Sequence, residues 1–180
     1  DDQVERLEMQ LEAALSQLSL SAGQLSAARK AAASELKERV SQELAQLAMA
    51  GATLEISLSP LTDFESHGND KIEFLLAAHP GAEPRPLGKG ASGGELSRIM
   101  LAIELVLASS QLLPTMVFDE VDAGVGGKAA LEVGRRLRKL AINSQVIVVT
   151  HLPQVALWAD NHILVEKDSN GLLSSTSIKS

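Results

Sequence analysis

Four short segments between residues 91 and 151 carry the residue types that chemistry needs. The first, residues 91–95, reads Ala-Ser-Gly-Gly-Glu. The second is an apolar run, residues 115–118, that ends in two carboxylates, and a Gly-rich turn, residues 121–127, follows it directly. The last is an apolar run, residues 146–149, that ends in Thr and His. Hydroxyl groups, bare backbone and carboxylates in this order suit a site that binds an anion and activates water.

The first segment predicts the start of a helix. Ser92 and Glu95 have the S-x-x-E spacing of a capping box, and a cap alone would explain both residues. A cap does not need Gly93 and Gly94, each of which costs a helix roughly 1 kcal/mol relative to Ala. Glycines let a ligand approach the N–H groups at the positive end of the helix, where phosphate binds well. We therefore favour an anion-binding helix start over a cap alone.

The second segment places Asp119 and Glu120 at the carboxyl end of a strand, which faces the ligand crevice in an open α/β sheet. Asp119 could then hold Mg²⁺, directly or through water, and Glu120 could orient or deprotonate an attacking water. Taken alone, a solvated strand end is the better interpretation. The Gly-rich turn that contains Asp122 could equally be a flexible connection.

His151 follows the last apolar run and lies at the same predicted edge of the sheet. It could donate a hydrogen bond to a phosphate oxygen, although a lone His in such a place is more often structural. The phosphate loop G-x-x-x-x-G-K-[ST] does not occur in the sequence. The chain is therefore expected to hold half of a nucleotide site.

The elements before these segments are predicted to be a long helix and a hairpin. Apolar residues at helical and heptad spacing predict a coiled-coil helix over 1–50, against an ordinary surface helix with an interruption at 21–23. Alternation predicts a strand over 54–58 that Pro60 stops, and a partner strand over 71–76. Residues 79–90, rich in Pro and Gly, are expected to form a loop.

From residue 92 onward the pattern is helix, strand, helix, strand, short helix, strand, strand, which is typical of an α/β fold. The first helix should run from Ser92 to about Ser109. The two apolar runs should be strands covered on both faces of a parallel sheet, with a crossover helix over 127–141 between them. Final strands are expected at 163–165 and 172–178. The buried stripe of the first helix is predicted to contain Leu96, Ile99, Met100, Ile103 and Leu107.

Composition removes several classes of function. The chain has no Cys, which excludes disulfides, thiolate metal sites and cysteine nucleophiles. It has no apolar run long enough for a membrane span and no basic leader, so we expect a cytoplasmic protein with no membrane partner. A net charge of −7 argues against a mainly DNA-binding surface. The basic run over 135–139 is more consistent with a solvated helix face.

Together, the four segments resemble the C-terminal lobe of SMC-like ABC ATPases, which have a signature motif, Walker B, D-loop and switch histidine in this order. Residues 89–102 (Lys-Gly-Ala-Ser-Gly-Gly-Glu-Leu-Ser-Arg-Ile-Met-Leu-Ala) and 150–156 (Thr-His-Leu-Pro-Gln-Val-Ala) are similar to the RecN family of bacterial DNA-repair proteins. Gly90 departs from the family pattern, which usually has an apolar residue there. The implied fold is a mostly parallel sheet flanked by helices, over 51–180, after a coiled-coil arm that re-enters the head, over 1–50.

The resemblance implies roles for the residues of the four segments. Ser92, Gly93 and Gly94 would meet the γ-phosphate of ATP held by a second copy, and Glu95 would be a further residue of this nucleotide-binding segment. Asp119 would serve Mg²⁺, and Glu120 would be the catalytic carboxylate. Asp122 would lie in the D-loop at the dimer interface, and His151 would sense the γ-phosphate.

The implied partners are an N-terminal Walker A lobe, a second copy of the head, and DNA through the full-length, nucleoid-associated protein. We expect an ATPase that serves DNA double-strand break repair and recombination, inactive as this chain alone. Either this chain is a fragment of a longer protein or the missing lobe is a separate chain, and the start inside a helical pattern favours a fragment. The alternatives are an ATP-dependent structural dimerisation module and a transporter nucleotide-binding fragment. Glu120 argues against the first, and the coiled coil against the second.

Overall fold

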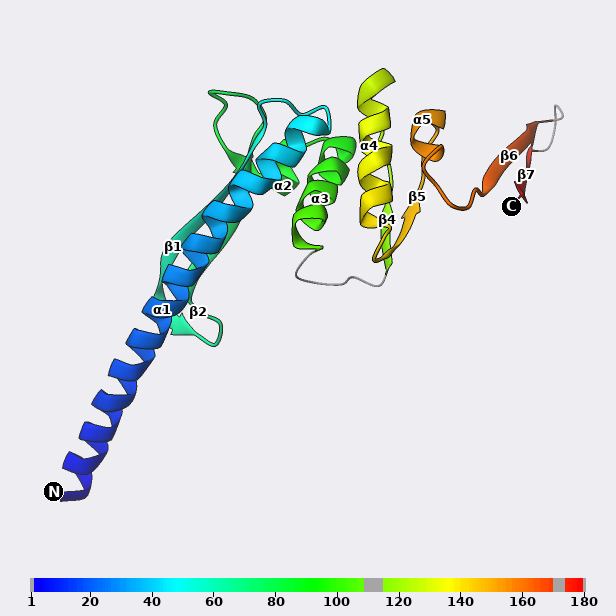
Figure 1. Ribbon diagram of the computed structural model, residues 1–180. Coiled ribbons are helices and arrows are strands. Elements are labelled where there is room, and N and C mark those ends of the chain that lie inside the picture. The colour runs from blue at the N-terminus through cyan, green and yellow to red at the C-terminus, as the bar shows by residue number, and fades with distance from the viewer. Residues whose placement is uncertain (1, 109–114, 170–173, 180) are drawn as a thin grey trace. The chain divides into compact units, whose positions relative to one another are not determined.

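The computed structural model describes residues 2–108, 115–169 and 174–179 (Figure 1). The chain divides into two compact units, one made of Asp1–Ala45 and Ala50–Ala91, the other of Gln46–Met49 and Ser92–Ser180. The sequence predicts a boundary at residue 50 between a coiled-coil arm and an ATPase lobe. The division into compact units does not test this boundary, which stays a prediction. No helix in the described residues is long and apolar enough to cross a membrane.

The first unit begins with the helix α1, Asp2–Gln46. Its sequence contains many strong helix formers and no Pro. The helix continues through residues 21–23, where the coiled-coil pattern is interrupted, and the missing side chain of Gly23 leaves open space. Side chains 2–21 are all exposed, and burial begins at Ala22. This exposed stretch retains the apolar seam that predicts a coiled coil, and the coiled coil stays a prediction.

The rest of the first unit is an antiparallel sheet in the order β1-β2-β3 and a short helix. Its strands are β1 (Thr53–Glu65), β2 (Gly68–Ala77) and β3 (Arg85–Pro86). The prediction that Pro60 stops the first strand is wrong, since Pro60 pairs with Asp70 and the register shifts only beyond it. β1 is an edge strand, where a residue without an N–H donor is tolerated. The predicted loop over 79–90 likewise contains β3 and the helix α2, Leu87–Gly90.

A polar contact fastens α1 to the hairpin within this unit. Arg29 Nη1 donates to Asp70 Oδ2 at 2.8 Å and Ser26 Oγ donates to Asp70 Oδ1 at 2.7 Å, while Arg29 Nη2 donates to the His67 carbonyl at 2.6 Å. These hydrogen bonds, that of Arg29 first, lower the pKa of the buried Asp70 carboxyl below its usual 3.8. Gly68 has a φ of 114° and leaves room for Arg29, whose Nη1 would lie 2.9 Å from an added Cβ.

The second unit has the predicted order of elements. These are α3 (Gly93–Leu107), β4 (Thr115–Phe118), α4 (Gly127–Leu140), β5 (Gln145–Val148), α5 (Pro153–Ala156), β6 (Leu164–Ser169) and β7 (Ser174–Lys179). β4 and β5 are parallel, with Phe118 opposite Val148, and α4 is the crossover between them. β6 and β7 pair antiparallel. The predicted end of the first helix at Ser109 and the start of the last strand at 172 lie outside the described residues.

Burial in the second unit differs from the prediction at two places. In α3, Ile99 is fully buried as expected, but Leu96 and Met100 are exposed, and Arg98 is buried instead. The inner face of α3 is rotated because the loop after β4 packs against Gly94 and Arg98. The prediction that both strands are covered on both faces is also wrong. Val117 and Val149 are 66% and 58% exposed, because the described elements cover only the face that contains Phe118.

Candidate functional site

The predicted capping box is present at the N-terminus of α3. Ser92 Oγ accepts from the Glu95 N–H at 3.4 Å, and the Ser92 N–H donates to Glu95 Oε2 at 2.8 Å. The Ser92 hydroxyl also donates to Glu95 Oε2 at 2.8 Å. The bond from the Ser92 backbone, followed by that from its hydroxyl, lowers the pKa of Glu95 below its usual 4.5. Ser92 itself remains exposed, so the helix start is open to a ligand.

The two glycines of this segment have close neighbours in the chain itself. A Cβ at Gly94 would lie 2.7 Å from Ala123 Cβ and 3.0 Å from the Glu120 carbonyl oxygen. A Cβ at Gly93 would lie 2.8 Å from Glu120 Oε2, the tip of a flexible side chain. Gly94 is therefore required by backbone packing, a reason that the sequence pattern did not reveal. Gly93 is exposed and has no backbone neighbour of this kind, so packing does not explain it and its role in anion binding stays a prediction.

Asp119 and Glu120 lie at the carboxyl end of β4, as predicted, and both are exposed. Glu120 has a φ of 55°, which is unusual for a residue with a side chain and costs of order 1 kcal/mol or more. Its carbonyl accepts from the Ala123 N–H at 2.9 Å, which closes the turn. Such strain is concentrated at functional sites, where surrounding contacts hold it in place.

Two residues of α3 hold this turn, and sequence reasoning missed both. Ser97 Oγ donates to the Asp119 carbonyl at 2.6 Å. The buried Arg98 donates from Nη1 to the Ala123 carbonyl at 2.8 Å and to the Val121 carbonyl at 3.4 Å. Burial lowers the pKa of the Arg98 guanidinium below its usual value. The only sequence signal was a charged residue directly beside the predicted apolar stripe of the helix.

The Gly-rich turn and the end of β5 are joined through Asp122. Its side chain is 2% exposed, and Oδ2 accepts a short hydrogen bond from Thr150 Oγ1. His151 Nδ1 lies 3.5 Å from the same oxygen, while the His151 side chain is 76% exposed. The backbone hydrogen bonds between β4 and β5 continue to the residue before Thr150, because the Val149 N–H donates to the Phe118 carbonyl at 2.9 Å.

The predicted site residues thus form one connected region of the second unit. The start of α3 contacts Glu120 and Ala123, and the turn that begins at Glu120 reaches His151 through Asp122. Within the described residues, no three His, Asp or Glu side chains are grouped to hold a metal. Mg²⁺ in nucleotide sites is commonly held by one or two carboxylates together with phosphates, and the exposed Asp119 suits such a partial shell.

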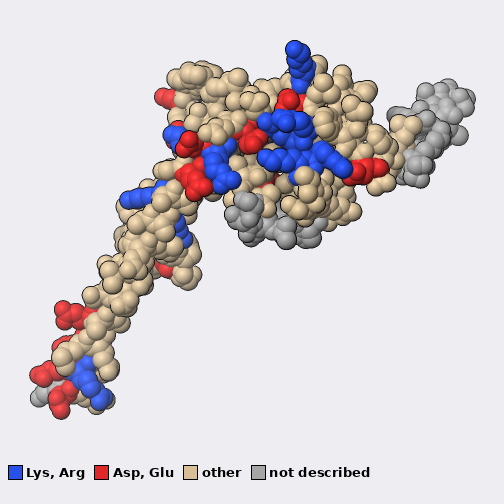
Figure 2. Space-filling model, in the orientation of Figure 1, with Lys and Arg blue, Asp and Glu red and all other residues tan. Residues whose placement is uncertain are grey.

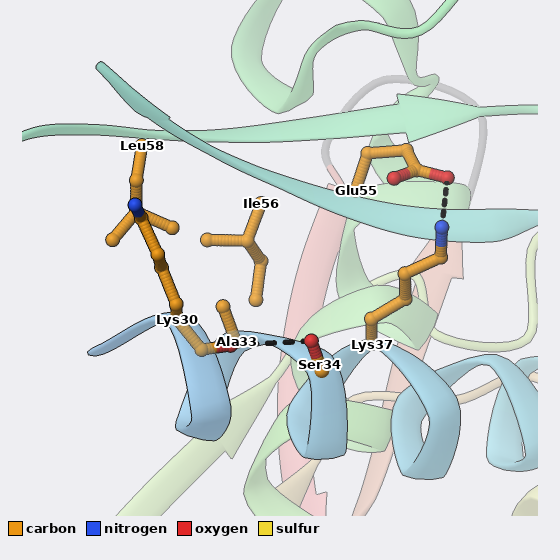
Figure 3. A pocket seen from close by; sticks show the side chains of 7 residues that line it. All are labelled: Lys30, Ala33, Ser34, Lys37, Glu55, Ile56 and Leu58. Atoms are coloured by element: carbon orange, nitrogen blue, oxygen red, sulfur yellow. Dashed lines mark hydrogen bonds and ion pairs between the residues drawn. The ribbon is translucent and has the colours of Figure 1, made fainter. Parts of the chain in front are cut away.

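A hollow of about 350 Å³ lies elsewhere, in the first unit, and contains none of the predicted site residues. Figure 3 shows it between α1 and β1, where Lys37 forms an ion pair with Glu55 at 2.7 Å. It is lined by Lys30, Ala33, Ser34, Lys37, Glu55, Ile56 and Leu58. Because Lys37 is already paired with Glu55, it is not a free charge for a ligand in this hollow. The predicted site residues all lie in the second unit.

Basic side chains gather over α4 (Figure 2). Arg135 pairs with Glu132 at 3.0 Å, and Arg138 pairs with Asp160. Arg136 is buried and also contacts Glu132. Hydrogen bonds from Arg135 and then Arg136 lower the pKa of Glu132 below its usual 4.5. Arg135 and Arg138 are exposed, as the prediction of a solvated helix face requires, whereas the burial of Arg136 differs from it.

Comparison with known proteins gives clear relatives in sequence. The chain is 50% identical over 167 residues to the DNA repair protein RecN of Streptomyces coelicolor, covering 86% of the chain and 29% of that protein. It is 49% identical over 183 residues to RecN of Mycobacterium leprae, covering 91% and 31%. For RecN of Halalkalibacterium halodurans the identity is 36%, covering 99% and 32%. The chain thus spans about three tenths of the length of these relatives. No protein-family model matches it.

Solved structures show the same fold. The Smc head domain of Pyrococcus furiosus, with an extended coiled coil, aligns at a TM-score of 0.54 and 21% identity, covering 81% of the chain and 34% of that structure. The Smc head domain of Pyrococcus yayanosii, with a coiled coil and joint, aligns at a TM-score of 0.56 and 21% identity, covering 84% of the chain and 28% of that structure. The predicted resemblance to RecN is confirmed, as is the predicted fold: a lobe like that of SMC head domains, with a parallel strand pair and helices, after a long N-terminal helix.

Proposed function

We propose that this chain is the C-terminal part of an ATP-hydrolysing, SMC-like head that closes on ATP with a second copy and serves DNA double-strand break repair and recombination. Its similarity to RecN DNA repair proteins supports the repair role. An N-terminal lobe supplies the phosphate loop, which this sequence lacks. The protein works in the cytoplasm at the nucleoid, where the full-length molecule meets DNA. This chain alone does not turn over ATP, because the backbone nest and Lys that hold the phosphates are absent.

One observation carries the proposal: the open start of α3, the two exposed carboxylates after β4 and His151 are linked by contacts within one unit. In this arrangement Ser92 and Gly93 offer an exposed helix N-terminus to the γ-phosphate. Asp119 provides an oxygen for Mg²⁺, which when bound neutralises phosphate charge. Glu120 orients and deprotonates the attacking water. His151 donates a hydrogen bond to a γ-phosphate oxygen.

The exposed apolar face of β4 and β5 also supports a missing lobe. Val117 of β4 and Ile147 of β5 are 66% and 46% exposed, and Val149, directly after β5, is 58% exposed, although parallel strands are normally covered on both faces. We propose that the N-terminal lobe covers this face in the full-length protein. The distinction from a transporter fragment rests on the RecN similarity and on the 45-residue helix α1.

Glu120→Gln in the full-length protein tests the catalytic assignment. The change keeps the size of the side chain and removes the base, so ATP binding should persist while turnover falls by about 100-fold or more. Nucleotide binding is measured by calorimetry and turnover by phosphate release. Glu83→Gln, at an exposed position of the first unit, is the matched control and should retain full turnover. If Glu120→Gln keeps turnover within about tenfold of wild type, Glu120 is not the base, and a structural ATP-dependent dimerisation module becomes the better explanation.

A further inference from the structure

Asp122 has a buried carboxylate that the proposed chemistry does not yet use. The resemblance to SMC-like ATPases assigns it to the interface between two copies. Its side chain is 2% exposed, and its carboxylate contacts Thr150 and His151 of the same chain. A carboxylate removed from water is costly unless hydrogen bonds hold it, so its partners explain why it can be there. Those partners are Thr150 and His151, the two polar residues at the end of β5.

The contacts form a chain of hydrogen bonds that fixes the loop after β5. The Leu152 N–H donates to Thr150 Oγ1 at 3.1 Å. Thr150 Oγ1 in turn donates to Asp122 Oδ2. Since this uses the hydroxyl proton and one of its lone pairs, Thr150 is held in a single orientation. Asp122, 28 residues before Thr150 in the sequence, thereby also positions the neighbouring residue His151.

The position of the His151 ring follows from the same carboxylate. Nδ1 lies 3.5 Å from Asp122 Oδ2, so a proton on Nδ1 is attracted to the carboxylate, whereas a lone pair there would be repelled. In a neutral imidazole, the hydrogen bond that one ring nitrogen makes decides whether the other nitrogen carries a proton. With Nδ1 directed at Asp122, Nε2 on the other side of the exposed ring is left for a ligand.

We propose that Asp122 is a positioning residue, which holds Thr150 and fixes the proton of His151 on Nδ1 so that Nε2 meets the γ-phosphate oxygen. The role of His151 toward ATP rests on the proposed function. The orientation of the ring by Asp122 does not, because both groups belong to the same unit of this chain. The effect of Asp122 on turnover is therefore exerted through His151 rather than through direct contact with nucleotide.

The first test is made on the full-length protein without nucleotide. Histidine ring nitrogens are observed by ¹⁵N NMR, and the His151 signals are assigned by their loss in His151→Ala. In the wild type, the neutral ring should carry its proton on Nδ1, and in Asp122→Asn this preference should be lost. Asp160→Asn, at an exposed position, is the matched control and should leave the signals unchanged. Identical His151 signals in wild type and Asp122→Asn would overturn the proposal.

Thr150→Val is a second variant in case Asp122→Asn does not fold. It removes the hydroxyl that fixes the carboxylate, so the His151 signals should again move, whereas Thr150→Ser, which keeps the hydroxyl, should preserve them. Unchanged signals in Thr150→Val would contradict the proposed chain of hydrogen bonds.

The second test uses ATP turnover of the full-length protein. Loss of a group that orients a functional histidine typically costs about 10- to 100-fold in activity, so kcat should fall by that factor in Asp122→Asn while KM for ATP changes little. In a His151→Ala background, Asp122→Asn should cause no further loss. An equal loss in both backgrounds would show that Asp122 acts elsewhere, for example at the dimer interface. A wild-type protein without turnover would refute the proposed function, and the NMR comparison would then decide the role of Asp122 alone.

Discussion

Gly94 and Gly93 are neighbours in sequence, yet the structure predicts opposite effects of Ala at the two positions. A Cβ at Gly94 would lie 2.7 Å from Ala123 Cβ and 3.0 and 3.2 Å from two carbonyl oxygens. These atoms belong to a turn that Arg98 and Ser97 hold in place, so the turn cannot move cheaply. Overpacking of this kind costs about 1–3 kcal/mol.

Ala also stabilises a helix relative to Gly, by up to about 1 kcal/mol. Three close approaches put the Gly94 overlap near the upper end of its range, so Gly94→Ala should lower the free energy of unfolding by about 2 kcal/mol. At Gly93 the close atom is the tip of the Glu120 side chain, which can rotate away. Gly93→Ala should therefore be neutral or stabilising by up to about 1 kcal/mol.

Urea unfolding of both variants and wild type measures the difference, provided that the slope with denaturant is unchanged. Gly94→Ala as stable as Gly93→Ala would refute the argument from backbone packing. Turnover of the full-length variants separates packing from phosphate binding. If Gly93 serves the γ-phosphate, Gly93→Ala should lower turnover without lowering stability, whereas full turnover would leave Ser92 and Glu95 as a cap alone.

Two further outcomes are expected. Because the folded-state pKa of Asp70 lies below 3.8, its contribution to stability is present above pH 3.8 and is lost as the pH falls through the lowered pKa. Arg29→Gln should therefore make the acid-induced loss of stability smaller. An unchanged pH profile of the free energy of unfolding, measured with urea, would contradict this. Ser92→Arg should block ATP-driven pairing of heads by filling the space for the γ-phosphate. A copy with Ser92→Arg, mixed with a copy that lacks the phosphate-loop Lys, should retain one active composite site, whereas both changes in one copy should leave none; equal turnover in the two mixtures would show that Ser92 is only a cap.

Local features of the fold were predictable because they depend on residues close in sequence. The capping box of Ser92 and Glu95, the order of elements from residue 92 and the strands before Asp119 and Thr150 all follow from spacing and composition. The polar residues at the strand ends could be assigned to one edge because parallel strands end at the same side of a sheet. The RecN resemblance added the roles, which spacing alone leaves open.

Features that depend on distant contacts could not be predicted. Pro60 continues in its strand because β1 is an edge, which alternation along one segment cannot show. Arg98 replaces Leu96 on the inner face of α3 because carbonyl groups 23 and 25 residues later accept its hydrogen bonds. The exposed face of Val117 and Val149 depends on what covers it, and the described elements cover only the other face.

The turn after β4 is the point at which these distant contacts meet. From one side, α3 holds the turn through Ser97 and Arg98, and Gly94 lets it approach the helix closely. From the other side, Asp122 binds the end of β5 through Thr150. A displacement of the α3 N-terminus by phosphate would therefore act on the backbone of Glu120 and, through Asp122, on the ring of His151. The start of α3, the turn at Glu120 and the ring of His151 are thus held by one set of contacts within this unit.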